Sequence, residues 1–319
     1  MKVWVATGAI LLVAGAAAAL LLVDDHLWRS DAHRPAPNIH VVVPHPRGPA
    51  HSRPDSPFAL EPAGRKPPVD IRFAPANEPR AGLLFDVDSG QVLWQHNAGK
   101  ELPIASLTKM MTALIVARRD RPDEKVLITP EAVAFEGSGV GVLPKGKRVP
   151  LKDLFYGLLL VSGNDAAIAL AQHDAGTVGA FVKRMNEWRD RLGLRCSRFS
   201  TPSGILDRGN YSCAKDLAAL ARADLADPWI RRVVATREAR FPFPIKGGFL
   251  DLYNNNPFIL QRMRGITGVK TGYTDAAGRC YVITQKVGDR ELGVVLLDSP
   301  NPLDQVPALL DAGFHRSTG

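Results

Sequence analysis

The chain lacks the short motifs that mark several large classes of binding protein. No pair of its three cysteines has metal-ligand spacing, no glycine-rich phosphate loop is present, and basic residues do not alternate with aromatic ones. We therefore expect no nucleic-acid partner and no zinc site. There is also no internal repeat, and 319 residues have room for one or two domains.

The formal net charge is +8, and most of it arises after Arg80 because the preceding segment is nearly neutral. A positive excess can attract anionic polymers or lipid surfaces. A solvated basic surface is the simpler explanation, so charge alone assigns no partner.

The N-terminus carries an uncharged stretch, residues 3–23, directly after Lys2. This stretch is long enough to cross a bilayer as a helix. Its positive start and its small residues also describe a secretory signal. Residues 1–23 are therefore predicted to be a signal peptide or an N-terminal membrane anchor. The anchor is favoured, because cleavage after Ala18 or Ala19 would leave an apolar mature end. Either way, everything after Asp24 is predicted to be exported.

The composition changes between residues 24 and 78. Twelve of the 25 prolines lie between Arg34 and Arg80, mixed with charged residues and few large apolar ones. Proline removes backbone donors, and little apolar surface is available to offset the entropy lost on ordering. We predict a Pro-rich disordered linker, either a spacer that lifts a domain off a membrane or a connection without a selected length.

Three cysteines in an exported protein leave one outside any disulfide. Cys196 and Cys213 flank a loop that contains proline and glycine, and a bridge between them is one option. Cys280 lies in an alternating apolar run, where we expect a buried thiol.

Three short motifs follow one another in the remaining segment: Ser106-Leu107-Thr108-Lys109, Ser162-Gly163-Asn164 and Lys270-Thr271-Gly272. They supply a hydroxyl nucleophile, two amines, a second hydroxyl and a carboxamide, which acyl transfer to serine requires. A single S-x-x-K or S-x-N triplet arises roughly once by chance in a chain of this length. Ser212–Lys215 and Ser299–Asn301 show the same two patterns, so order and context must decide.

The periodicity of apolar residues predicts the surrounding elements. A hairpin is predicted over residues 81–96 and three strands over 265–271, 278–286 and 291–297. Helices are predicted over 106–119, from Thr129 as N-cap, over 151–161, 165–173, 178–192 and 302–314, and over 213–225 with Ser212 as its cap. A hairpin at one end and strands at the other imply a single antiparallel sheet that both ends of the chain share.

With these three motifs in this order, the chain resembles the serine D-Ala-D-Ala carboxypeptidases, the low-molecular-mass penicillin-binding proteins of the S11 type. The likeness extends beyond the triplets, to Ala105–Thr112, Ser162–Ala167 and Lys270–Thr274, and covers roughly residues 81–315. It implies an α/β (α+β) fold of the β-lactamase/DD-peptidase type, in which helices flank a five-stranded antiparallel sheet beside an all-helical subdomain. Residues 79–319 would form this catalytic domain.

The base in such a site is expected to be a lysine. Lys109 lies three residues after Ser106 on one helix, so both side chains share a face. A lysine with an ordinary pKa is neutral only about 0.04% of the time at pH 7. Burial and a second cation both favour the neutral amine, and the resemblance places Lys270 as that cation. His96, His173 and His315 lie in no serine-protease context.

The resemblance assigns the remaining roles. Ser162 relays a proton to the leaving amine, and Asn164 holds Lys109 and the substrate's amide carbonyl. Thr271 binds the substrate carboxylate, and Gly272 lets the peptide approach the strand. The backbone N–H groups of Ser106 and Tyr273 form the oxyanion hole, and neither a metal nor an organic cofactor is implied.

We therefore expect a serine D-alanyl-D-alanine carboxypeptidase that acts on peptidoglycan stem peptides through an acyl-enzyme on Ser106. β-Lactams should acylate the same serine. The enzyme would work at the extracytoplasmic face of the membrane, which the N-terminal segment would contact. Some members of the family place an arginine after the last strand to hold the substrate carboxylate, and residues 298–305 contain none.

That departure keeps a DD-endopeptidase of peptidoglycan crosslinks as the alternative. A serine β-lactamase is less favoured, because no acidic residue stands in a loop that would activate the deacylating water. A wall-binding protein without catalysis is also less favoured, because all the catalytic side chains are present.

Overall fold

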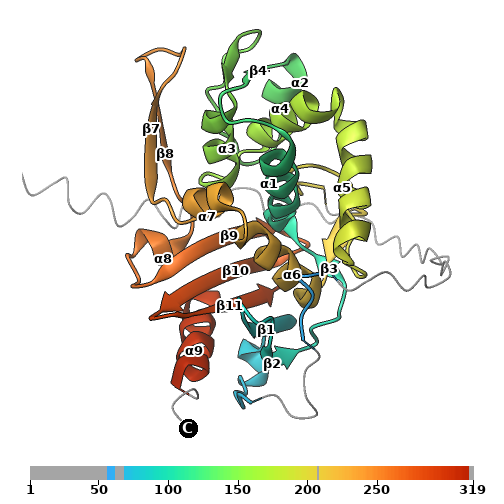
Figure 1. Ribbon diagram of the computed structural model, residues 1–319, viewed down its shortest axis with the longest axis vertical. Coiled ribbons are helices and arrows are strands. Elements are labelled where there is room, and N and C mark those ends of the chain that lie inside the picture. Colours follow the sequence, from blue (N-terminus) through green and yellow to red (C-terminus); the bar gives the residue numbers. More distant parts are fainter. Residues whose placement is uncertain (1–55, 62–67, 207, 316–319) are drawn as a thin grey trace, which may run out of the picture. The chain divides into compact units, whose positions relative to one another are not determined.

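The structure, a computed structural model, describes residues 56–61, 68–206 and 208–315 (Figure 1). The predicted signal or anchor, and the linker up to residue 55, lie outside these residues. No helix in the described ranges combines the length and the apolar character that a bilayer span requires.

A five-stranded antiparallel sheet forms the base of the described domain, in the order β2-β1-β11-β10-β9. The first two strands come from the predicted hairpin and the other three from the end of the chain, so the prediction of one shared sheet is confirmed. The strands are β1 (Ala81–Asp86), β2 (Val92–His96), β9 (Ile266–Thr274), β10 (Gly278–Val287) and β11 (Arg290–Leu297).

The sheet is buried on both faces, which explains why β1 and β11 are almost continuously apolar. Leu83 and Val295 face a large core that the sheet shares with the helices above it in Figure 1. Leu84 and Val294 point the other way, into a smaller core with the C-terminal helix α9 (Pro302–His315).

The helices above the sheet form the second part of the domain (Figure 1). Met110, Met111, Leu114 and Ile115 of α1 are at most 1% exposed, as their helical spacing predicts. The predicted cap is also present, since Thr129 Oγ1 accepts a hydrogen bond from Ala132 N. These helices are α1 (Thr108–Arg119), α2 (Pro130–Val133), α3 (Leu151–Leu159), α4 (Asn164–Ala175), α5 (Val178–Leu192), α6 (Ala214–Leu225) and α7 (Pro228–Val234). The short helix α8 (Pro257–Leu260) lies beside the sheet (Figure 1) and adds Phe258 to the smaller core, and two 3-10 turns are formed by Pro75–Asn77 and Ala105–Leu107.

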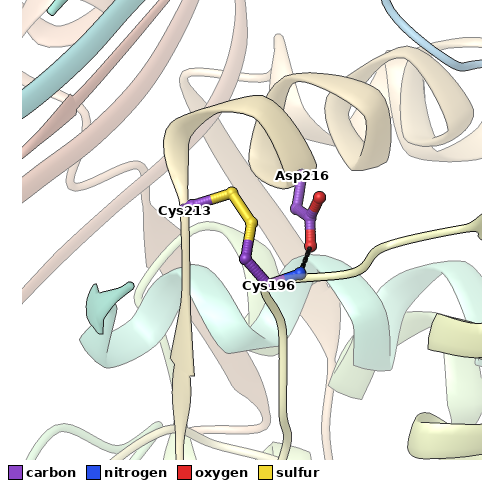
Figure 2. Close-up of side chains that lie close together, drawn as sticks. All are labelled: Cys196, Cys213 and Asp216. Atoms are coloured by element: carbon purple, nitrogen blue, oxygen red, sulfur yellow. Dashed lines mark hydrogen bonds between the residues drawn. A yellow bond between two sulfur atoms is a disulfide. The ribbon is translucent and has the colours of Figure 1, made fainter. Parts of the chain in front are cut away.

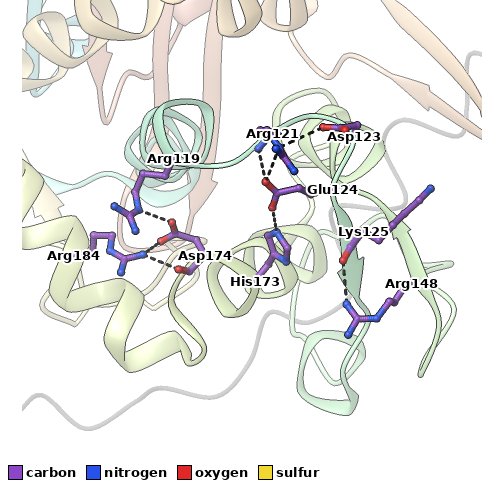
Figure 3. Close-up of polar contacts among 9 residues, drawn as sticks. All are labelled: Arg119, Arg121, Asp123, Glu124, Lys125, Arg148, His173, Asp174 and Arg184. Atoms are coloured by element: carbon purple, nitrogen blue, oxygen red, sulfur yellow. Dashed lines mark hydrogen bonds and ion pairs between the residues drawn. The ribbon is translucent and has the colours of Figure 1, made fainter.

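Ion pairs connect three of these helices, α1, α4 and α5 (Figure 3). Asp174, near the end of α4, is 1% exposed at its side chain and accepts from Arg119 of α1 at 2.7 Å. It also pairs with Arg184 of α5. Beside this group, Glu124 and His173 lie 2.7 Å apart. Two guanidinium groups offset the cost of burying this carboxylate, so the contacts link α1, α4 and α5.

Three two-stranded sheets complete the domain. None of them was predicted from the sequence, and the longest is a hairpin that projects beside α3 (Figure 1). The pairs are β3 (Leu102–Pro103) with β6 (Tyr211–Ser212), β4 (Lys125–Leu127) with β5 (Arg148–Pro150), and β7 (Glu238–Pro242) with β8 (Phe249–Tyr253).

The prediction that Ser212 caps the helix after it is wrong. The N-cap of α6 is Cys213, whose side chain makes no capping hydrogen bond. Ser212 instead pairs with Leu102 in the β3–β6 sheet, and its hydroxyl lies 2.7 Å from that of Ser197. A tertiary pairing has taken the residue that local capping rules would place at the helix end.

Cys196 and Cys213 form a disulfide, with Cα atoms 5.8 Å apart, which settles the option that the sequence left open. Asp216 on α6 lies beside the bridge and accepts from Cys196 N at 2.8 Å (Figure 2). Cys280, which takes no part in this bridge, is fully buried as predicted.

The packed domain begins before residue 79. Val69 N donates to Leu93 O at 3.0 Å, and Trp94 Nε1 donates to Ile71 O at 2.9 Å. Further back, Arg222 Nη1 donates to Ala59 O. Residues that the composition assigned to the linker therefore lie against β2 and α6.

Candidate active site

The first motif stands at the start of α1, where a 3-10 turn (Ala105–Leu107) leads into the helix. This turn and the three-residue spacing bring Lys109 Nζ to 2.8 Å from Ser106 Oγ. Ala105 adopts φ 47°, a backbone conformation that residues other than glycine rarely adopt. Strain immediately before the serine is typical of functional positions.

Lys109 is completely buried, and its amine has two further partners. Nζ lies 2.7 Å from Asn164 Oδ1 and 2.8 Å from the carbonyl oxygen of Ser203. Both oxygens are acceptors only, because the Asn164 amide is oriented by its Nδ2 donating to Glu136 O. A neutral amine can donate its two hydrogens to these oxygens, which leaves its lone pair for the Ser106 hydroxyl.

Burial lowers the pKa of Lys109 well below its usual value, and the positive charge of Lys270 lowers it further. The Asp165 carboxylate opposes both effects. The lowered pKa favours the neutral form that a general base requires.

Lys270, on the edge strand β9, is 1% exposed, and its Nζ donates to Thr271 O at 2.8 Å. Burial lowers the pKa of Lys270 to about 7. Its charge is therefore partly lost near neutral pH, so Lys270 acts as a full cation only on the acidic side of that value.

Ser162 lies between α3 and α4, in the second motif. It adopts φ 62° and is 3% exposed. Its hydroxyl has no hydrogen-bond partner among the described residues. A buried hydroxyl that is held under backbone strain without a partner is available to a reacting group.

The third motif runs along the edge of the sheet, against the Ser106 turn. A Cβ on Gly272 would stand 2.9 Å from Ser106 N and 3.2 Å from Ile104 O, so only glycine permits this approach. Tyr273, the next residue, is 48% exposed. Thr271 Oγ1 donates to Asn255 Oδ1 at 3.1 Å.

Sequence reasoning missed a loop that holds the start of α1, residues 197–212. Besides the Ser203 carbonyl on Lys109, Pro202 O accepts from Thr112 Oγ1 at 2.7 Å, and Asn210 Nδ2 donates to Thr108 Oγ1 at 2.7 Å. Backbone carbonyls leave no signal in a sequence. The proline and glycine of the loop indicate a turn and nothing more.

The candidate metal-ligating clusters of the described residues contain no residue of the three motifs. Two clusters bring three metal-ligating side chains close enough to hold an ion: Cys196, Cys213 and Asp216, and Asp120, Glu124 and His173. In the first cluster the sulfur atoms are joined to each other. In the second, His173 and Glu124 bind one another.

The chain is similar to proteins of known function over most of the described domain. The model of the family "Peptidase S11, D-alanyl-D-alanine carboxypeptidase" matches residues 71–301. The D-alanyl-D-alanine carboxypeptidase DacF of Bacillus subtilis is 32% identical over 76% of this chain and 63% of its own length. A D-alanyl-D-alanine endopeptidase of Pseudomonas aeruginosa is 33% identical over 69% of this chain and 71% of its own length.

The fold is also found among solved structures. A D-alanyl-D-alanine carboxypeptidase of Mycobacterium tuberculosis matches with a TM-score of 0.72 at 31% identity, over 78% of this chain and 96% of that one. The predicted β-lactamase/DD-peptidase type of fold is thereby confirmed. The chain spans less than two thirds of the length of the Bacillus subtilis relative.

Proposed function

The chain belongs to the D-alanyl-D-alanine carboxypeptidase family, peptidase S11, and on this premise we propose that it removes the terminal D-Ala from peptidoglycan stem peptides. The observation that carries the proposal is the buried amine of Lys109, 2.8 Å from the Ser106 hydroxyl. The lowered pKa of Lys109 makes this amine a suitable base for the Ser106 hydroxyl.

The reaction begins with attack by Ser106 Oγ on the carbonyl carbon of the penultimate D-Ala. Lys109 accepts the hydroxyl proton, because its two other contacts are with oxygens that cannot donate. The oxyanion is held by the backbone N–H groups of Ser106 and Tyr273. Losing one such donor typically raises the barrier by about 3 kcal/mol.

Collapse of the tetrahedral intermediate breaks the peptide bond. Ser162 donates its hydroxyl proton to the departing amine of D-Ala and receives in turn the proton that Lys109 took from Ser106, a role for which its unpartnered hydroxyl is suited. Lys270 and Thr271 hold the substrate beside β9, where the peptide adds as a strand along the open edge. Water then hydrolyses the ester on Ser106 and restores the enzyme.

β-Lactam antibiotics are the proposed inhibitors, since they present a comparable amide beside a carboxylate. Intact mass after penicillin exposure, followed by peptide mapping, tests nucleophile and family together. We expect one adduct on the peptide that contains Ser106 and none in Ser106→Ala. An adduct on another residue, or one that persists in Ser106→Ala, would contradict the proposal.

A DD-endopeptidase is the second candidate function. It is favoured by the likeness to the Pseudomonas aeruginosa endopeptidase and by the lack of arginine in residues 298–305. Parallel assays with a free pentapeptide and with crosslinked muropeptides separate the two functions. Faster cleavage of the crosslinked substrate would favour the endopeptidase.

We also propose an extracytoplasmic location, in agreement with the family's action on the cell wall. Residues 1–23 would serve as anchor or cleaved signal, and the Pro-rich residues after them would serve as the linker. The intact mass of the protein purified from membranes decides between anchor and signal. A soluble form that begins after Ala18 or Ala19 would exclude the anchor.

A further inference from the structure

The proposed substrate ends in a free carboxylate, and the site needs a cation to receive it. This inference rests on the proposed function. The segment that follows β11 offers no arginine. Lys109 and Lys270 are buried and burial lowers the pKa of both amines, so neither is a full cation near neutral pH. Thr271 contributes only a neutral hydroxyl at the edge of the sheet. A cation for the carboxylate must therefore come from another residue near Thr271.

Arg279 lies on β10, the strand next to β9. In the antiparallel register Arg279 is opposite Tyr273, and Tyr281 is opposite Thr271. Opposite residues point to the same face of a sheet, so Arg279 and Thr271 share a face as diagonal neighbours. Such neighbours are about 7–8 Å apart between backbones, which is within reach of a long side chain.

Arg279 also lies against the segment from which the arginine is missing. Its Nη1 donates to Pro300 O at 3.3 Å, and its carbonyl accepts from Ser299 N at 3.0 Å. These contacts fix the start of β10 beside the end of β11. The guanidinium group thus lies beside Pro300, in the segment from which the arginine is missing.

The charge of Arg279 is not neutralised by an ion pair within the described ranges, and the residue is exposed. By contrast, Arg231 forms an ion pair with Glu291, and Arg290 forms one with Asp86. A guanidinium with five donors, one of which is in a long hydrogen bond, retains a free edge for a carboxylate.

Both tyrosines of this face feel the positive charge. The hydrogen bond to Asp275 raises the pKa of Tyr273, and Arg279 opposes that rise. Burial raises the pKa of Tyr281, and Arg279 again opposes it. These two residues flank the Thr271 position, so the charge acts at the place where the carboxylate would lie.

We propose that Arg279, together with the Thr271 hydroxyl, binds the α-carboxylate of the substrate's terminal residue and makes the site select peptides with a free C-terminus. β9 is the edge strand, so the end of a peptide added beside it can be reached from the face that carries Arg279. This assignment favours carboxypeptidase over endopeptidase action.

The test compares two substrates and three variants. The substrates are one peptide that ends in D-Ala-D-Ala with a free carboxylate and the same peptide with a C-terminal amide. For Arg279→Gln we expect kcat/KM to fall about 10- to 150-fold on the free carboxylate, the range for a hydrogen-bonded charge, and to change little on the amide. Arg279→Lys should retain part of the preference, because it keeps the charge but not the two-donor edge.

Lys286→Gln is the matched control, because it removes one exposed positive charge from the other end of β10. It should leave both substrates unaffected. Equal losses on both substrates in Arg279→Gln, or no loss, would overturn the assignment of Arg279. Wild-type protein that releases no D-Ala from the free-carboxylate peptide would instead contradict the proposed function, so the two failures are distinguishable.

Discussion

Two residues of one type carry different chemistry here because their surroundings differ. Lys109 meets two oxygens that can only accept and a hydroxyl that can donate, whereas Lys270 bonds a single backbone carbonyl. Burial lowers the pKa of both amines, and the charge of Lys270 lowers the pKa of Lys109 further. The pair is therefore asymmetric, with Lys109 as the base and Lys270 as the charge that assists it.

The asymmetry predicts a shift in pH dependence. Acylation should rise with pH as Lys109 loses its proton, because only the neutral amine accepts the proton of Ser106. Lys270→Gln removes a charge that lowers the pKa of Lys109, so the acidic limb of the rate profile should move to higher pH. The measurement is the rate of penicillin acylation across pH, with exposed Lys215→Gln as the control. A limb that stays in place, or moves to lower pH, would contradict the electrostatic role of Lys270.

Gly272 permits a second prediction at the scale of one residue. In Gly272→Ala, the new methyl group would press on Ser106 N and Ile104 O, both of which are backbone atoms. Displacement of that N–H from the oxyanion should slow acylation about 100- to 1,000-fold. Gly99→Ala is the control, because a Cβ there meets nothing within 4 Å. Time-resolved labelling with a fluorescent penicillin measures both, and equal rates would show that the approach of β9 to the serine is not critical.

At the scale of elements, the loop of residues 197–212 determines how the start of α1 is held. Ser203, Pro202 and Asn210 of the loop hydrogen-bond to Lys109, Thr112 and Thr108, respectively. The disulfide joins the two cysteines that flank the loop, and Asp216 accepts from Cys196 N (Figure 2). Asn186 of α5 braces the middle, donating from Nδ2 to Phe199 O at 2.8 Å. The loop is thus held by its hydrogen bonds to α1, by Asn186 and by the disulfide, and only the disulfide is covalent.

Removing the bridge should therefore affect both stability and chemistry. A disulfide with a sequence separation of 17 stabilises a fold by about 3 kcal/mol, and Cys196→Ser/Cys213→Ser should lose about that much free energy of unfolding. Acylation should also slow, because the Ser203 carbonyl is less firmly held on Lys109. Urea unfolding and penicillin acylation measure the two effects. Reductant should slow penicillin acylation of the wild type and leave acylation of the double variant unchanged. If the reduced wild type loses stability but is acylated at its full rate, the bridge has only a structural role.

The elements that could be predicted are those whose pattern is local. Met110, Met111, Leu114 and Ile115 indicate a helix by spacing alone, and the three late strands are runs of 8 to 10 residues that are separated by turns. The β7–β8 hairpin was missed although its residues alternate in exposure, because each strand has only five residues and Pro242 is atypical of a strand. Ser212 was misassigned because a long-range pairing with β3 outweighs a local capping pattern.

The candidate site also contains residues that the sequence indicates and residues that it does not. Motif order and helical spacing indicate Ser106 with Lys109, and the resemblance indicates the other side chains. The Ser203 carbonyl could not be predicted, since it depends on how a loop 94 residues away folds back onto the lysine. Arg279 could not be predicted either, because its relation to Thr271 depends on the strand register.

At the scale of the whole molecule, the sheet joins the two ends of the chain and the helices are inserted between them. The serine and its lysine come from the helical part and the third motif from the sheet, so the site forms where the two parts meet (Figure 1). Anything that loosens the packing of the helices on the sheet should therefore act on stability and on the site together. The corner between α6 and α7 is one such place, because it holds a buried carboxyl group.

Asp224 is 1% exposed, and neither of its carboxyl oxygens has a hydrogen-bond partner among the described residues. Burial raises the pKa of Asp224 well above its usual value, the charge of Asp227 adds to the rise, and Arg118 opposes it. Asp227 keeps its own place as the N-cap of α7, accepting from Trp229 N at 2.9 Å. The fold therefore favours the protonated form of Asp224.

The sign of the pH dependence follows from that preference. Because the folded pKa of Asp224 exceeds the unfolded one, its contribution is most favourable below the unfolded value and is lost as pH rises through the folded value. Asp224→Asn removes the titrating proton and should be more stable than the wild type by about 1–3 kcal/mol at neutral pH, with the difference shrinking toward pH 4. Urea unfolding at several pH values measures it, with Asp123→Asn, 82% exposed at its side chain, as the control that should change little. A difference between Asp224→Asn and the wild type that stays constant across this range would show that Asp224 remains charged in the folded protein and is stabilised by Arg118.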